Sequence, residues 1–357
     1  MELMRAHNQW MARKEDERFE DLDSLYAQVK ARTEEASTWM TDVRGSRLFV
    51  EGVDEERITL EMADGRGVGF TPWSFHQLCQ VYNAPSRYVS RLDPNLAVQC
   101  LEDNQRNLEE NTNTYKMLMG SPTTLRAVTS PQYGRIWDHE VVEKCMEIKE
   151  LNPEFYNPPA YCPFGGGHKP SGLYASDRDV FMFLIDGGSR LDVSERAKMN
   201  RGFFMWNSEV GSKTFGVSCF LFNEVCGNHI VWGATHVTEM IIKHSKKVRD
   251  RFDQIIDKVF KAYNIKHMHE EEEVIVTAIN RKLPTGAKEI VDWTQSRLPT
   301  ITRKQVNEAI RVATIEEGQC ETVWDLVQGL TAIARDIPFM DKKVTIERGA
   351  GKLLNSM

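Results

Sequence analysis

The chain has 357 residues, of which 41% are hydrophobic and 27% charged, and its formal net charge is −7 at pH 7. This length suits one large domain or two ordinary ones, and the absence of any run of about 18 apolar residues predicts no membrane-spanning helix. The negative charge argues against general electrostatic binding to nucleic acid, so any such binding needs a local basic groove.

Residues 1–44 have the pattern of a highly charged helix. Leu22, Leu25 and Val29 recur at three- and four-residue spacing, which predicts a narrow apolar stripe that packs on a neighbouring element or subunit. Charged residues stand where a signal peptide would have its apolar centre, so we expect a protein of the cytoplasm. We assign residues 1–44 to a helical N-terminal extension.

Residues 45–280 are predicted to form an α+β core. Short strand patterns fill residues 47–70, and helices follow from Trp73. Residues 115–129 predict two strands joined by a turn, and Asp138 is placed to cap the helix that follows. The proline- and glycine-rich residues 152–170 predict a loop, which is either a surface loop or a backbone cradle for phosphate.

Residues 173–232 predict an antiparallel meander of consecutive strands. Asn207, Ser208, Glu209 and Asn228 interrupt its apolar pattern. Because unpaired buried polar groups are costly, we expect these four residues to lie together and to be buried. They either satisfy backbone groups inside a sheet or form a functional centre.

From Thr238 to Tyr263 the apolar residues recur at helical spacing, which predicts one long helix with a basic first half. Residues 281–357 are predicted to form a helical C-terminal region, in which a linker with a short helix precedes helices at 304–314 and 322–336. The predicted fold class is therefore α+β, an antiparallel sheet meander with long packed helices.

Seven cysteines are scattered without a C-x-x-C pair, which favours free thiols over zinc ribbons or disulfides. His267 and His269 precede an acidic run, and this pattern fits an acidic helix start better than a metal site. We therefore predict no metal and no cofactor.

Several segments resemble a phage- and plasmid-borne family catalogued as the domain of unknown function 932. Residues 125–143 resemble its R-A-x-x-S-x-x-Y-x-R pattern, residues 206–211 its N-S-E-V-G motif and residues 226–228 its C-x-N motif, and the tail resembles its closing helices. The commonest pattern has Gly after the Asn, where this chain has His229. The motif residues carried over are Arg126, Tyr133, Arg135, Asn207, Ser208, Glu209, Asn228 and His229. The resemblance implies a phage or prophage protein acting in the cytoplasm of a bacterial host.

The predicted order of meander and long helix resembles the core of phage single-strand annealing proteins, which assemble into rings. This analogy favours a protein that binds single-stranded DNA in recombination or replication, for example in strand annealing, and that forms homo-oligomers. Tyr174 and Trp206 are candidates for stacking on bases. The candidate phosphate-binding residues are Lys169, Arg178, Arg201, Lys213, Lys243, Lys246, Lys247 and Arg249.

Two other functions remain open. An enzyme of unknown reaction could use Glu209, Cys226, His168, His229 or His236. No nucleophile–base signature is present, however, and we favour a non-enzymatic role. A protein that interacts with host defence without catalysis is the other alternative. Salt-dependent binding of single-stranded DNA would favour the first function, and metal in the purified protein would favour an enzyme.

Overall fold

The computed structural model confirms the α+β class, because it has two mostly antiparallel sheets with helices packed on them. Among the residues it describes, no helix is both long and apolar enough to cross a membrane. The described residues are 17–52, 57–62, 64–108, 114–157, 159–160, 169–170, 172–195, 197–223, 228–230, 240–248, 251–252, 254, 268–335 and 337–356.

The larger sheet is an antiparallel meander, as predicted, with strand order β1-β11-β12-β13-β14-β15. Its long central strands are β12 (Val180–Ser194), β13 (Ala197–Asn207) and β14 (Phe215–Asn223). β16 also pairs with β14, and β8 with β12. The short strands are β1 (Glu17–Arg18), β8 (Phe155–Tyr156), β11 (Leu173–Ala175), β15 (Asn228–Ile230) and β16 (Met240–Ile242).

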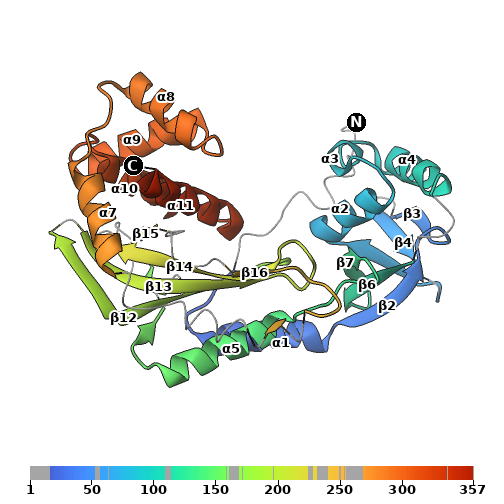
Figure 1. The fold of residues 1–357 in the computed structure, drawn as a ribbon. Coiled ribbons are helices and arrows are strands. Elements are labelled where there is room, and N and C mark those ends of the chain that lie inside the picture. The colour runs from blue at the N-terminus through green and yellow to red at the C-terminus, as the bar shows by residue number, and fades with distance from the viewer. Residues whose placement is uncertain are drawn as a thin grey trace.

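Helices cover both faces of this sheet, as Figure 1 shows. Met182 and Leu184 belong to the core shared with α1 (Leu22–Glu34) and α5 (Asp138–Leu151). The alternate residues Phe181 and Phe183 belong to the cluster that includes Met340 and Val344 of α11 (Met340–Asn355). Because both faces are buried, the strands have continuous apolar runs in place of alternation.

The smaller sheet has the order β2-β6-β7-β5-β4-β3, and only β5 and β7 pair in parallel. Phe75 of α2 (Pro72–Val81) and Leu101 of α4 (Pro94–Arg106) belong to the same core as Ile58 and Met117 of the sheet. The elements are β2 (Ser37–Asp42), β3 (Arg47–Glu51), β4 (Arg57–Glu61), β5 (Gly67–Phe70), α2 (Pro72–Val81), α3 (Ser86–Val89), α4 (Pro94–Arg106), β6 (Thr114–Ser121) and β7 (Thr124–Thr129). The predicted strand pair in 115–129 is thus confirmed.

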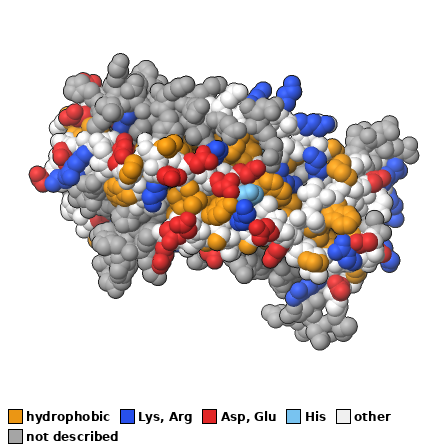
Figure 2. Space-filling model, turned by 90° about the horizontal axis from the view of Figure 1, so that it is seen from below, with side chains coloured by type: hydrophobic (Ala, Val, Ile, Leu, Met, Phe, Trp, Pro, Cys, Tyr) orange, Lys and Arg blue, Asp and Glu red, His pale blue; other side chains and the backbone are white. Residues whose placement is uncertain are grey.

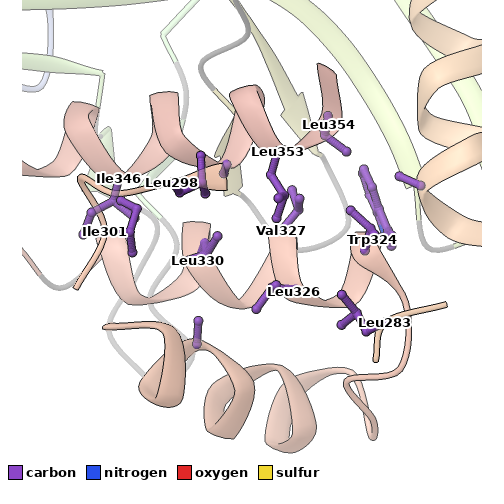
Figure 3. Packing of buried hydrophobic residues seen from close by; sticks show 14 of the residues in the cluster. Leu283, Leu298, Ile301, Trp324, Leu326, Val327, Leu330, Ile346, Leu353 and Leu354 are labelled. Carbon is purple, nitrogen blue, oxygen red and sulfur yellow. The ribbon is translucent and has the colours of Figure 1, made fainter. Parts of the chain in front are cut away.

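The C-terminal helices pack around α10 (Val323–Arg335). Figure 3 shows Leu330 and other α10 side chains between neighbouring helices. A Cβ on Gly329 would lie 2.2 Å from the carbonyl oxygen of Ala309, so glycine permits the close approach of α10 and α9 (Arg303–Glu316). Helices expected around 304–314 and 322–336 are confirmed. The other helices are α7 (Met268–Asn280), α8 (Ala287–Arg297) and α9 (Arg303–Glu316).

Some local predictions are wrong. The helix predicted over Thr238–Tyr263 is wrong for Met240–Ile242, which form strand β16 on the edge of β14. Much of the rest of that range lies outside the described residues. The β-branched residues Ile241 and Ile242 are compatible with a helix or a strand. Pairing with the free edge of β14 favours the strand. Asp138 is the first residue of α5, and Trp137 occupies the cap. The loop predicted at 152–170 includes β8 and the pair β9 (Pro159–Ala160) and β10 (Lys169–Pro170).

Candidate functional site

The polar motif of residues 207–209 lies where β13 turns toward β14, and it is buried as predicted. Asn207, Ser208 and Glu209 are 0%, 0% and 1% exposed. The Asn207 amide donates to the Ile136 carbonyl oxygen at 2.9 Å, and the Ser208 hydroxyl donates to the Arg178 carbonyl oxygen at 2.6 Å. These side chains hold neighbouring backbone in place, which is the structural role expected of buried polar groups.

Glu209 joins the two sheets through an ion pair. Its Oε1 lies 2.7 Å from Nη2 of Arg126, which belongs to β7 of the smaller sheet. The two side chains are 1% and 9% exposed, so little solvent screens the pair. A Cβ on Gly120 would lie 2.1 Å from Cδ of Arg126, so glycine leaves the space that the arginine stem needs.

A second carboxyl group, that of Asp138, is buried beside Glu209. The backbone N–H of Asp138 donates to Oε2 of Glu209 at 3.2 Å, and its Oδ1 accepts from the Asn207 amide at 2.7 Å. Burial, and next the charge of Glu209, raise the pKa of Asp138 well above its usual value. With 3% and 1% of their surfaces exposed, Asp138 and Glu209 are enclosed inside the protein.

The residues of the 126–135 motif meet the 207–209 motif in space. The Tyr133 hydroxyl donates to the Ser208 carbonyl oxygen at 2.9 Å, and Arg135 donates to the carbonyl oxygen of Glu209. The Arg135 guanidinium lies 5.5 Å from the ring centre of Tyr133. Burial raises the pKa of Tyr133 and lowers that of Arg135. The two sequence motifs therefore form one network at the joint between the sheets.

Asn228 does not belong to this network, and the prediction that placed it there is wrong. It pairs with Asn223 at one end of β14, whereas Asn207 lies beside the other end, at Phe215. Eight residues of strand separate those ends, which is about 26 Å. The zigzag of a meander places the turns before and after a strand at opposite ends. The side chains of Asn228 and His229 lie outside the described part of the structure.

Residues 243–248, here called the lysine turn, join the network although sequence reasoning placed them on a helix. Ser245 forms an isolated β-bridge with Tyr133, and Nδ1 of His244 lies 3.1 Å from the Gly134 carbonyl oxygen. The rings of Tyr133 and His244 stack with centres 5.0 Å apart. Burial lowers the pKa of His244 to about 4, so this ring is neutral at pH 7.

The lysine turn carries three candidate phosphate-binding residues. Lys243, Lys246 and Lys247 are exposed, and none of them has an ion pair among the described residues. Arg178 and Lys213 lie at the same end of the sheet, in the turns before β12 and before β14, with side chains 17% and 27% exposed. We call this end, made of residues 176–179, 208–214 and 243–248, the turn end.

Other candidates are not placed to bind a strand. Arg201 is 1% exposed inside β13 and pairs with Glu271 at 3.0 Å, so the prediction that it contacts phosphate is wrong for this structure. Tyr174 and Trp206, predicted to stack on bases, are each 4% exposed in the cluster that includes residues of α11. Because both faces of the sheet are covered by helices at these positions, the side chains cannot line a groove. Arg249 and the side chain of Lys169 lie outside the described part.

A cleft of about 880 Å³ lies beside this joint, and sequence reasoning missed it because its walls come from distant segments. One wall belongs to the smaller sheet and α2, and the other to β1, α1 and the turn after β11. The lining residues are Glu17, Gln28, Arg32, Phe70, Thr71, Pro72, Gly120, Ser121, Thr124, Arg126, Ala175, Ser176 and Asp177.

Charge on the described surface is mixed. Figure 2 shows Lys and Arg side chains among Asp and Glu side chains on the face seen from below, with apolar side chains between them. The five described cysteines are free thiols, and no group of three His, Cys, Asp or Glu residues in the described ranges could hold a metal ion. No family model, no curated protein and no solved structure matches this chain.

Proposed function

We propose that this protein binds single-stranded nucleic acid across the turn end of its larger sheet. The observation that carries the proposal is the lysine turn, in which Lys243, Lys246 and Lys247 are exposed without ion-pair partners among the described residues. Lysines of this kind are available for contacts with phosphate groups, and each such contact releases counterions from the nucleic acid.

The positions of the other turn-end cations support a strand as the ligand. Arg178 precedes β12, and the lysine turn follows β16, with β13 and β14 between them. Three strand spacings separate these places, which is about 14 Å. Cations spread along such a row suit a flexible backbone that crosses the sheet end, because each can meet a different phosphate.

The rigidity of the lysine turn favours the same function. Its backbone is held by the Tyr133–Ser245 bridge and by the N–H of Gly134, which donates to the His244 carbonyl oxygen at 3.3 Å. A fixed backbone lowers the entropy lost when the lysines are ordered on a ligand. With a net charge of −7, binding is expected to be local and strongly salt-dependent.

The biological setting proposed here rests on the family resemblance of the motifs. It is recombination or replication of phage DNA in a bacterial cytoplasm, with the chain acting as a homo-oligomer, as annealing proteins do. The Glu209–Asp138 pair is assigned to the joint between the sheets and not to catalysis, because both groups are enclosed.

Replacing Lys243, Lys246 and Lys247 together by alanine tests the proposal. Each single-strand phosphate contact contributes about 0.7 to the slope of log K against log salt, so the slope should flatten by about 2. Fluorescence anisotropy of a labelled oligo(dT) at several salt concentrations measures this slope for the wild type and the variant.

The matched control replaces Lys288, Lys304 and Lys352, which are exposed on C-terminal helices, and removes the same charge. Its slope should equal that of the wild type. Equal slopes for both triple variants, or no binding by the wild type at low salt, would refute the proposal.

A further inference from the structure

Arg178, Lys213 and the three lysines of the lysine turn are here called the cation row. The cleft between the sheets adjoins this row, because both use the turn after β11. Ser176 and Asp177 line the cleft, and Arg178 follows them directly in the row. A volume of about 880 Å³ lies within the range of small-molecule sites, which is about 300–1,000 Å³. A ligand that crosses the turn end could therefore place one of its groups in this cleft.

Positive and negative side chains are paired on the cleft walls, so that their charges largely cancel. Nη2 of Arg32 lies 3.7 Å from Oε2 of Glu17, and Nη2 of Arg126 lies 2.7 Å from Oε1 of Glu209, which neutralises its charge. The cleft thus offers little net attraction to a bare phosphate, in contrast to the row outside. A polar ligand without net charge suits it better.

Hydrogen-bonding groups of both kinds line the cleft. Gln28, Thr71 and Ser121 bring amide and hydroxyl groups, which can donate and accept, and Phe70 and Pro72 bring apolar surface. A nucleobase has the complementary properties, because its edge carries donors and acceptors and its faces are apolar and planar.

Each side of the cleft also carries a guanidinium that is held in place. Nη1 of Arg32 donates to the Ser176 carbonyl oxygen at 2.6 Å. Arg126 is 8% exposed and is fixed by Glu209 and by contact with Gly120, and no hydrogen bond is made by its Nη1 among the described residues. The Arg32 side chain is 23% exposed, and a guanidinium plane is a surface on which an unstacked base packs.

We propose that this cleft receives one nucleobase, either from the strand bound across the turn end or from a free nucleoside. In the first form the inference rests on the proposed function, since the strand must first bind to the row. In the second form it stands by itself. The shared chemistry is a planar, uncharged base with hydrogen-bonding edges.

The test narrows the cleft without touching the Arg126–Glu209 pair. Ser121, the last residue of β6, lines the cleft, whereas Thr123 in the turn that follows is exposed and is not among the lining residues. Ser121→Trp should block the base, and Thr123→Trp is the matched control. Gln28→Trp, on the opposite wall, is a second blocking variant whose circular dichroism and Tm are checked in the same way.

Two measurements use these full-length variants. The first compares oligo(dT) with an abasic strand of equal length, which keeps the phosphates and lacks the bases. The wild type and Thr123→Trp should prefer oligo(dT) by roughly fivefold or more, since stacking of one base contributes about 1–3 kcal/mol. The blocking variants should bind both strands alike. The second measures binding of thymidine and adenosine by saturation-transfer NMR.

The outcomes separate this inference from the proposed function. Salt-dependent binding without preference for bases, together with no nucleoside binding, overturns the inference and leaves the proposed function standing. If no strand binds, the proposed function fails, and nucleoside binding that Ser121→Trp abolishes still supports the cleft. Base preference or nucleoside binding that survives in both blocking variants overturns the assignment to this cleft.

Discussion

Glu347 is a buried carboxyl group on α11, with 1% of its surface exposed. Burial raises its pKa to about 7, and the charge of nearby Lys343 partly opposes this rise. Because the folded state holds this proton more tightly than the unfolded chain, the group's contribution to stability is complete below pH 4.5 and is lost as pH rises through 7. Single residues of the helical region thus make its stability depend on pH.

Replacing Glu347 by glutamine should remove this dependence, since the amide resembles the protonated acid. Relative to the wild type, the variant should gain stability between pH 4.5 and pH 8, by up to about 3 kcal/mol. Urea unfolding at several pH values measures the difference. Glu150→Gln, at an exposed position of α5, is the control and should show no such trend. A constant difference across the pH range would contradict the assignment.

At the scale of elements, the lysine turn shows how a neighbouring strand edge overrides local periodicity. Apolar residues at three- and four-residue spacing predicted a helix, yet β14 offers unpaired backbone to Met240–Ile242. The turn that follows packs on Gly134, where a Cβ would lie 2.0 Å from the Ser245 carbonyl oxygen. Glycine at position 134 is therefore what allows the two segments to approach.

Gly134→Ala should push the lysine turn away from Tyr133. Overpacking of this kind costs about 1–3 kcal/mol, and the Tm should fall accordingly. Trypsin should also cleave faster at Lys243, Lys246 and Lys247. Gly45→Ala is the control, because a Cβ there would meet no atom closer than 3.9 Å. Equal Tm and equal cleavage rates in the two variants would show that the close approach is not maintained in solution.

At the scale of the whole molecule, the two sheets meet at the buried network around Arg126 and Glu209. Trp73 and Gln77 of α2 both donate to the Val210 carbonyl oxygen, at 3.0 and 2.9 Å, so helix, turn and ion pair meet at one place. The cation row and the cleft both lie beside this joint, since Arg126 lines the cleft and Ser245 of the lysine turn pairs with Tyr133 of the network. Their relative position therefore depends on the network.

Arg126→Met should destabilise the protein by about 3–5 kcal/mol at pH 7, because Glu209 is left buried without its partner. Guanidinium unfolding at pH 7 measures the loss of free energy of unfolding. Arg303→Met breaks the exposed pair with Asp292 and should cost less than about 1 kcal/mol. Similar losses in both variants would contradict the role of the joint.

The sequence alone determined the α+β class, the meander and the burial of Asn207, Ser208 and Glu209, because these follow from local period and from the cost of unpaired polar groups. It could not place Arg126 against Glu209, which lies 83 positions along the chain, nor assemble the cleft from five separate segments. It also failed for Arg201 and for the lysine turn. Burial on both faces and pairing at a sheet edge are properties of the packed molecule, and only tertiary structure decides them.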